Sequence, residues 1–315
     1  MNIPTLNSAD EVIAALKERG TCWGRVPATE TYHAWKPIIE QATGAAVVSK
    51  SSLHEFATSP YRYKHGKRKE SAAMGFGQLV DCLALTPELF EAEYYLAKET
   101  FDKRTKEGKA KAAEMEAEAA GRKIIKPDEY EPVKMCADCV TEALADHGLI
   151  MGENAAAQVA MFVYMTELGG EPLPCPLVIT GCLDILPFSG NTLDDLKTTR
   201  EDVENEAKLR RVCEDFGYGI QGALYTDLFN LCTGEQRNEF RFLFVSTMTV
   251  GDDKPAAQSR MVSMSNYVLD DYRKLYVRLL RAFALASATG EWGSKHLPTV
   301  IFEPSKWEME KIYNF

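Results

Sequence analysis

The sequence predicts an α/β fold, with a mixed central β-sheet flanked by helices and with helical additions at the N-terminus. Runs rich in β-branched and apolar residues at 177–186 and 240–250 predict strands. Amphipathic segments with capping residues predict helices near both ends of the chain. The composition is globular, with 45% hydrophobic and 26% charged residues, and a length of 315 residues suits one large domain with insertions.

Composition and charge exclude several classes of protein. No apolar run reaches the roughly 20 residues that span a bilayer, and the start, MNIPTLNSADEV, lacks the basic and apolar regions of an export signal. We therefore expect a soluble cytoplasmic protein that makes no membrane contact and keeps its eight cysteines reduced. The net charge of −10 argues against a generally basic nucleic-acid-binding surface. Residues 61–69 nevertheless hold five Lys/Arg and no acid, which leaves a local DNA-binding strip open.

The first 45 residues are predicted to form a helical extension of the main domain. Ser8 and Glu11 make a capping-box pattern before a short helix that ends at Gly20. A further helix is expected over 52–58, because Pro60 cannot continue it.

Three further helical segments are predicted before the sheet. The segment 72–85, AAMGFGQLVDCLAL, is nearly all apolar, so its single acid, Asp81, is conspicuous. Residues 101–126 are rich in Ala, Lys and Glu, which predicts a charged helical insertion, either a solvated helix or an arm that contacts DNA. Cys136 and Cys139 form a CxxC in a helical segment, and without a second such pair we interpret them as small buried residues rather than metal ligands.

The most informative stretch, PLVITGCLDILPFSGNTLDDLKTT, predicts a β-hairpin. Two strands, 177–186 and 192–199, flank a turn-forming segment. Because strand side chains alternate between faces, Asp195 and Lys197 share one face of the hairpin. If the register brings Asp184 alongside, two carboxylates and an ammonium converge.

The downstream segments complete the α/β pattern. Residues 201–231 read as helical, although two glycines weaken the helix locally. Gln221 and Tyr225 are four residues apart and therefore share a face of this helix. An apolar strand follows, and then a long amphipathic helix that ends at Gly290.

The convergent acids and lysine suit metal-dependent hydrolysis of a phosphodiester. Neighbouring carboxylates are costly to bury unless a cation neutralises them. Mg²⁺ or Mn²⁺ takes oxygen ligands and keeps waters that can act as nucleophiles. A lysine beside the metal can orient or deprotonate such a water and offset charge on the transition state. The competing interpretation of a D-x-K triplet is an exposed ion pair, and only the neighbouring motifs argue against it.

The order of these motifs resembles a known family. An apolar helix with one acid, Asp184, the D-L-K triplet at 195–197 and Q-G-A-L-Y at 221–225 are similar to the PD-(D/E)xK nuclease superfamily, in its RecB-like branch with a QxxxY motif. The segments VSKSSLHEFATSPYRYKHG, FGQLVDCLAL and TGEW look closer still to the RecE-type exodeoxyribonuclease VIII group of phages and prophages. The resemblance covers about residues 47–305 and implies a restriction-endonuclease-like core over 46–315.

The resemblance also implies a role for individual residues. Two ions of Mg²⁺ or Mn²⁺ would be bound by Asp81, Asp184, Asp195 and the backbone carbonyl of Leu196. Lys197 would be the catalytic lysine, Gln221 would steady the site or touch DNA, and Tyr225 would pack behind it.

The sequence departs from the family pattern at two places. Relatives usually present Gly-x-x-x-His on the apolar helix, whereas Gly77 is followed by Asp81, whose oxygen can still bind Mg²⁺. Relatives often have an arginine before the first catalytic aspartate, where this chain has Gly181-Cys-Leu, so one phosphate-binding charge could be missing.

Hydroxyl and basic residues early in the domain are candidates to bind a terminal 5′-phosphate. They are Ser51, Ser52, Ser59, Arg62 and Lys64. The alternative for Ser51 is that it caps the short helix.

The resulting expectation is a metal-dependent exonuclease that degrades linear double-stranded DNA from 5′ to 3′ in phage-type recombination. The resemblance further implies a homo-oligomeric ring, a trimer or tetramer, around duplex DNA, a single-strand annealing partner, and a bacterial host cell. Two alternatives stay open. One is a structure-specific or single-strand endonuclease of the same fold, and the other is a catalytically silent module that binds DNA ends or proteins.

Overall fold

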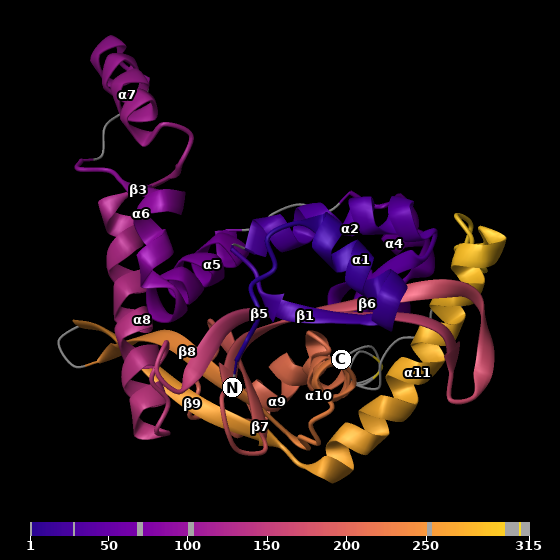
Figure 1. Cartoon of the computed structure of the whole chain (residues 1–315). Helices are drawn as coiled ribbons and strands as arrows, with labels where there is room; N and C mark the ends of the chain where they lie inside the picture. The colour runs from indigo at the N-terminus through magenta and orange to yellow at the C-terminus, as the bar shows by residue number, and fades with distance from the viewer. Residues whose placement is uncertain are drawn as a thin grey trace.

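The fold is built around a seven-stranded mixed sheet, as the sequence predicts (Figure 1). The computed structural model describes residues 2–27, 29–67, 72–99, 104–250, 254–299 and 309. The strands run in the order β1-β5-β6-β7-β8-β9, and β2 pairs with β6. They are β1 (Thr21–Arg25), β2 (Ala46–Ser49), β5 (Ala155–Leu168), β6 (Glu171–Pro187), β7 (Thr192–Thr199), β8 (Glu239–Val250) and β9 (Lys254–Met264). The pairs β2–β6 and β7–β8 are parallel and the others are antiparallel.

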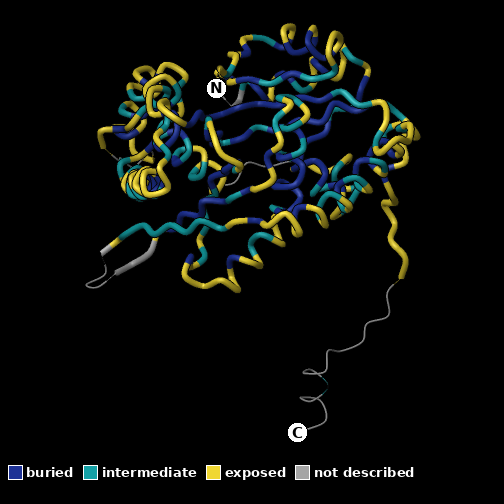
Figure 2. Tube along the Cα trace, turned by 60° about the horizontal axis from the view of Figure 1, so that its bottom comes forward, coloured by how far each residue is buried: buried dark blue, intermediate teal, exposed yellow. Residues whose placement is uncertain are grey.

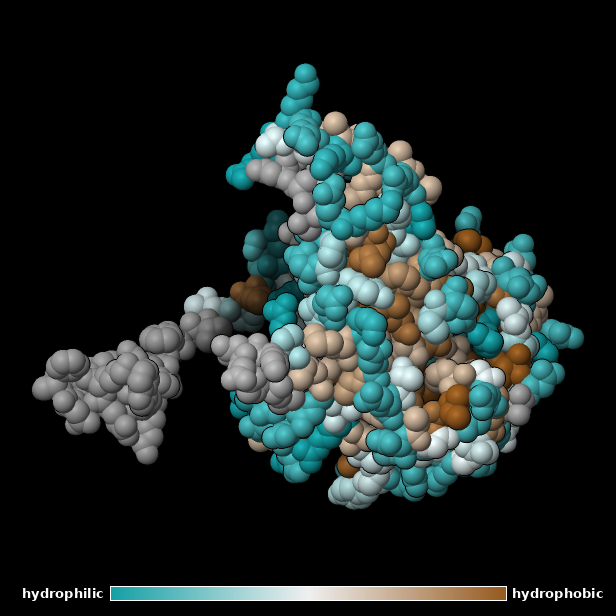
Figure 3. Space-filling model, turned by 90° about the vertical axis from the view of Figure 1, so that its left-hand side faces the viewer, coloured by the Kyte–Doolittle hydropathy of each residue, from teal (hydrophilic) through white to brown (hydrophobic). Residues whose placement is uncertain are grey.

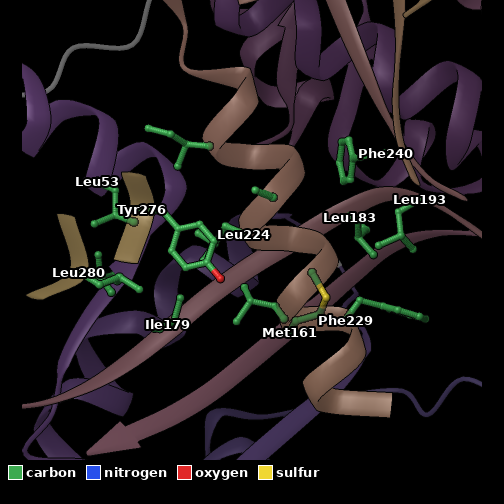
Figure 4. Close-up of a cluster of buried hydrophobic side chains, with 14 of the residues drawn as sticks. Leu53, Met161, Ile179, Leu183, Leu193, Leu224, Phe229, Phe240, Tyr276 and Leu280 are labelled. Atoms are coloured by element: carbon green, nitrogen blue, oxygen red, sulfur yellow. The ribbon is translucent and has the colours of Figure 1, made fainter. Parts of the chain in front are cut away.

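Helices cover both faces of the sheet, and the strands between them are largely buried (Figures 1 and 2). One face packs against α1 (Ala9–Arg19), α2 (Thr29–Thr43), α5 (Ala72–Leu85) and α8 (Pro127–Asp146). The other face packs against α3 (Lys50–Thr58), α10 (Tyr218–Thr233) and α11 (Asn266–Thr289). Figure 4 shows how Leu224 and Phe229 of α10 lie among sheet residues such as Met161 and Leu183 in this second core.

The remaining helices and a small second sheet complete the fold. They are α4 (Pro60–His65), η1 (Pro87–Leu89), α6 (Phe90–Glu93), α7 (Lys106–Ala119), α9 (Glu206–Asp215) and a small parallel sheet of β3 (Tyr94–Leu96) and β4 (Lys123–Ile125). The predicted helix over 201–231 is divided into α9 and α10 at Gly217, which has a positive φ of 62°. Among the described helices, none is long and apolar enough to cross a membrane.

The N-terminal residues are more closely integrated than a helical extension. The predicted cap is present in α1, where the Ser8 hydroxyl accepts a hydrogen bond from the backbone N–H of Glu11 at 3.3 Å. The prediction named only helices here, but β1 pairs antiparallel with β5 and forms an edge of the main sheet. Apolar side chains of α1 and α2 form one cluster with residues of β5 and β6. The two helices alone could not bury these apolar side chains, so they need the sheet to pack against. The boundary at residue 45 stays a prediction.

The predicted charged insertion contains α7 and leads into β4. Residues 101–103 of this segment lie outside the described ones. Helix α7 projects from the body of the molecule, and the surface in that region is mostly hydrophilic (Figures 1 and 3). This agrees with a solvated helix, and contact with DNA stays a prediction.

Candidate active site

The candidate site lies where strands β6 and β7 separate. The two strands are joined at a single residue pair, Ile185–Asp194. Beyond this pair, the Asp184 carboxylate accepts a hydrogen bond from the backbone N–H of Leu196 at 3.2 Å. A side-chain oxygen therefore satisfies a strand N–H that the neighbouring strand does not reach. This contact brings Asp184 alongside the D-L-K triplet, as the hairpin interpretation required.

A local irregularity in β5 and β6 creates this geometry. In β5, Ala157 packs toward α5 and α8, whereas Val159 packs toward α10 and α11, although residues two apart normally share a face. In β6, Leu183 and Ile185 likewise pack against opposite faces of the sheet, although they are two residues apart. Gln158, between the first two, has a φ of 55°, an uncommon conformation for a residue other than glycine.

Asp184 therefore occupies the point at which β6 changes face. Strand residues 157 and 159 pair with 185 and 183, so Gln158 and Asp184 lie opposite each other between those pairs. Strained backbone of this kind is found at functional sites more often than elsewhere.

Strand β7 places Asp195 and Lys197 on one face, as alternation predicts. The two side chains form an ion pair, with the Asp195 side chain 1% and the Lys197 side chain 17% exposed. Leu196 points the other way, into the cluster beneath α5 and α8. Asp195 is buried and Lys197 is mostly covered, so the interpretation of the triplet as an exposed ion pair is wrong.

Helix α10 supplies the second partner of Asp195. The Gln221 amide donates a hydrogen bond from Nε2 to Asp195 Oδ1 at 2.7 Å. Tyr225, one turn later, lies against Gly181 of β6, where an added Cβ would come within 2.7 Å of its ring. Gly181 is thus required for the close approach of this tyrosine, which packs behind the site.

Helix α5 brings Asp81 into electrostatic range of the same groups. The helix crosses β7 at Gly77, where an added Cβ would lie 3.1 Å from the Thr198 hydroxyl. Burial raises the pKa of the Asp81 carboxyl to about 7, with Lys197 opposing and Asp195 adding to the shift. The apolar helix with one acid therefore directs that acid toward the site.

The site brings three carboxyl groups into range of one lysine. Burial raises the pKa of Asp184 to about 6, and Asp81 adds to the shift, while Lys197 and the Leu196 N–H oppose it. Burial and the neighbouring Asp184 also raise the pKa of Asp195 well above its ordinary value. Burial alone would lower the pKa of Lys197, but Asp195 and Asp184 outweigh it and hold that pKa above its usual range. A further cation would favour the charged forms of these carboxyl groups.

The donor chemistry of the site fits a hard divalent cation. Asp81, Asp184 and Asp195 offer carboxylate oxygens, which Mg²⁺ and Mn²⁺ prefer. Within the described ranges, no three His, Cys, Asp or Glu side chains are already arranged to hold an ion. Asp195 is engaged by Lys197 and Gln221 in this state.

The predicted phosphate-binding residues have local structural roles or are exposed. Helix α3 is capped by Ser49 and not by Ser51, which is exposed. Ser52 is buried, and its hydroxyl lies 3.1 Å from the hydroxyl of Ser49. The hydroxyl of Ser59 caps α4 by accepting from the backbone N–H of Arg62 at 3.2 Å. The Lys64 ammonium lies 5.0 Å from the centre of the Trp292 ring.

Among the described residues, none of the five predicted phosphate-binding residues hydrogen-bonds or pairs with Asp184, Asp195 or Lys197. Their phosphate-binding role stays a prediction. Residues 68 and 69 of the basic strip lie outside the described ones.

Lys50 is a site residue that the sequence interpretation missed. Its ammonium donates a hydrogen bond to the backbone carbonyl of Phe216 at 2.6 Å and lies 4.8 Å from the centre of the Tyr218 ring. The Lys197 ammonium lies 5.1 Å from the same ring centre, so the two ammonium groups are within about 10 Å of each other. Burial and, secondarily, Lys197 lower the pKa of Lys50 to about 7. A lysine in the first turn of a helix reads as solvent-exposed, so no sequence signal marked it.

The CxxC of α8 is placed as its structural interpretation predicts. Cys136 is fully buried and Cys139 is partly buried in the cluster that α5 and α8 share with the sheet. Both thiols pack as small apolar groups.

A family model and two solved structures match this chain to different extents. A family model, described as a PDDEXK-like domain of unknown function (DUF3799), matches residues 48–280. A candidate exonuclease from Eubacterium rectale aligns with a TM-score of 0.51 at 14% identity, over 91% of this chain and 97% of that one, and this likeness concerns the fold alone. A phage-related exonuclease from Haemophilus somnus 129PT aligns with a TM-score of 0.34 at 15% identity, over 78% of this chain and 96% of that one. Among curated proteins, no match is found.

The predicted superfamily is thereby confirmed, whereas the RecE-type group and the QxxxY branch stay predictions. The family model spans most of the chain, from β2 to α11, and includes every candidate site residue from Asp81 to Tyr225. This chain is therefore a member of the PDDEXK-like domain family DUF3799.

Proposed function

We propose that this protein is a metal-dependent exonuclease that hydrolyses linear double-stranded DNA, with 5′ to 3′ polarity and with Mg²⁺ or Mn²⁺ as cofactor. The observation that carries the proposal is the contact of Asp184 with the Leu196 N–H and of Asp195 with Lys197, which gathers the three largely covered side chains where β6 and β7 separate. The carboxylates suit divalent cations, and the lysine suits a phosphate.

The chain's own residues have distinct tasks in this proposal. Asp184 and Asp195, with Asp81 nearby, would hold up to two divalent ions, and the Leu196 carbonyl would be a further ligand. Bound metal supplies Lewis-acid activation of water and of the phosphate. Lys197 would orient the attacking water and offset charge on the phosphate oxygens. Gln221 holds Asp195 by its amide, which keeps one carboxylate oxygen fixed.

Two variants test the assignment directly. Asp184→Asn and Lys197→Met should each abolish Mg²⁺-dependent degradation of linear duplex, while far-UV circular dichroism stays that of the parent. Asp138→Asn is the matched control, because Asp138 is an exposed carboxylate on α8 paired with Lys134. Undiminished digestion by either site variant contradicts the assignment.

The choice of substrate separates the proposal from its alternatives. Duplex labelled at the 5′ or the 3′ end gives the polarity, and an end-dependent enzyme spares covalently closed circular DNA. Cleavage of the closed circle would identify an endonuclease. DNA binding without hydrolysis in either Mg²⁺ or Mn²⁺ would identify a silent binding module.

The ring assembly and the annealing partner belong to the same proposal and rest on the sequence resemblance. Sedimentation of the full chain with and without linear duplex would report a trimer or tetramer. A monomer under both conditions would contradict the ring.

A further inference from the structure

An exposed aromatic ring lies beside the proposed catalytic lysine. Phe216, in the break between α9 and α10, is 56% exposed although it is a large apolar residue. Its ring stacks on Tyr218, with centres 5.8 Å apart and planes 20° apart. Because the Lys197 ammonium lies 5.1 Å from the Tyr218 ring centre, the Phe216 ring is within about 11 Å of Lys197. One strand of DNA advances only about 3.4 Å per nucleotide along its axis, so this distance corresponds to very few nucleotides.

The ring is held rigidly from behind. Tyr218 stacks in turn on the buried Phe242, with centres 5.3 Å apart and planes 27° apart. The backbone carbonyl of Phe216 accepts the hydrogen bond from the Lys50 ammonium at 2.6 Å. Gly217 has a positive φ of 62°, and His54 fills the space that a side chain there would need. The backbone of Phe216 is thus held in place, its ring stacks on Tyr218, and more than half of the residue is exposed to solvent.

The surrounding charges favour an uncharged group on this ring. Glu214 and Asp215 are exposed immediately before Phe216, and they disfavour a phosphate at the ring itself. The ammonium groups of Lys50 and Lys197 lie next to Tyr218, 4.8 and 5.1 Å from its ring centre. A nucleotide that placed its phosphate toward Lys197 and its base toward Phe216 would match both charge patterns.

We propose that Phe216 is a stacking platform for a nucleobase of the DNA strand that occupies the active site. The inference rests on the proposed nuclease function and adds a base-binding subsite to it. Aromatic side chains bind bases of any sequence in this way, because every base has a π-face. The platform would hold the strand end in place without reading its sequence.

Substitutions that separate stacking from mere hydrophobicity test the platform. Phe216→Leu keeps an apolar side chain but removes the π-face, so KM for linear DNA should rise about tenfold with kcat nearly unchanged. Phe216→Trp should restore the parental KM. Leu231→Ala is the matched control, since Leu231 is 52% exposed and lies near the other end of α10. A parental KM for Phe216→Leu overturns the proposal.

A binding measurement keeps the inference separate from the proposed function. Binding of DNA is measured in EDTA with the Asp184→Asn chain, so that no hydrolysis is needed. Single-stranded ends carrying abasic sites at the terminal nucleotides should bind about tenfold more weakly than intact ends. In the Phe216→Leu background the abasic substitution should make no further difference. Additive effects would overturn the platform. Intact coupling together with no hydrolysis of DNA by the parental chain in Mg²⁺ or Mn²⁺ would overturn only the proposed nuclease function.

Discussion

The carboxylate of Asp184 takes the place of a backbone acceptor for the N–H of Leu196, 3.2 Å away. Strands β6 and β7 can therefore separate after one residue pair without leaving this N–H unsatisfied. A hydrogen bond to an ionised acceptor is stronger than a neutral one, which fixes the carboxylate beside Asp195. The same contact thus opens the hairpin and positions a proposed metal ligand.

Replacement of Asp184 by asparagine should stabilise the metal-free protein. An acid whose folded pKa is raised, here from 3.8 to about 6, loses folding stability as pH rises through that interval. Asparagine keeps an oxygen for the Leu196 N–H but carries no charge. In EDTA at pH 8 the variant should gain about 1–3 kcal/mol, and the gain should shrink as pH falls from 6 toward 4. Urea unfolding at pH 4, 5 and 8 measures this, and a gain independent of pH would contradict it.

Replacement of Lys50 by methionine should change the pH dependence of stability in the opposite direction. A lysine whose folded pKa is lowered from 10.5 to about 7 makes the folded protein more stable as pH rises through that interval. Lys50→Met removes this gain, so the variant should lose about 1 kcal/mol relative to the parent for each pH unit above 7. Urea unfolding at pH 6.5, 8 and 9 checks the slope. Lys17→Met, which removes an exposed lysine of α1, is the control.

Addition of one methyl group at Gly181 should disturb the packing behind the site. The new Cβ would lie 2.7 Å from the Tyr225 ring, so Gly181→Ala should cost about 1–3 kcal/mol of unfolding free energy. In the background of Tyr225→Leu the same alanine should cost less, with a coupling energy of about 1 kcal/mol or more. Chemical denaturation of the four proteins in this cycle measures the coupling. Strict additivity would show that the ring does not exclude the methyl group.

The conformation of Gln158 should tolerate glycine better than valine. A φ of 55° is open to glycine and strained for a β-branched residue, so Gln158→Val should be about 1–2 kcal/mol less stable than Gln158→Gly. Because Asp184 lies opposite, the valine variant should also lose most nuclease activity on linear duplex. Equal stability of the two variants would show that the backbone relaxes freely at this position.

The sequence predicts most of the helices, and it predicts which side chains of β7 share a face, through local rules. The caps of α1 and the end of α11 at Gly290 follow from residues within one turn. The glycines at 217 and 219 predicted only a local weakening of one helix, not its division into α9 and α10. Alternation alone puts Asp195 and Lys197 on the same face, and spacing alone puts Gln221 and Tyr225 on one side of α10. The sequence did not reveal strand β5, because its long apolar run AAAQVAMF does not alternate between apolar and polar residues.

The sequence by itself therefore determined which residues of β7 and α10 face the same way, because these relations depend on neighbours a few positions apart. Only the tertiary structure decided that the Asp184 side chain lies beside these residues. At Gln158 and Asp184 the strands change which face their side chains point to, so simple alternation along β6 does not predict the direction of the Asp184 side chain. It also decided that Lys50 reaches the Tyr218 ring and the carbonyl of Phe216, a residue 166 positions away in the chain. Long-range contacts of this kind are set by packing of whole layers, and no local pattern encodes them.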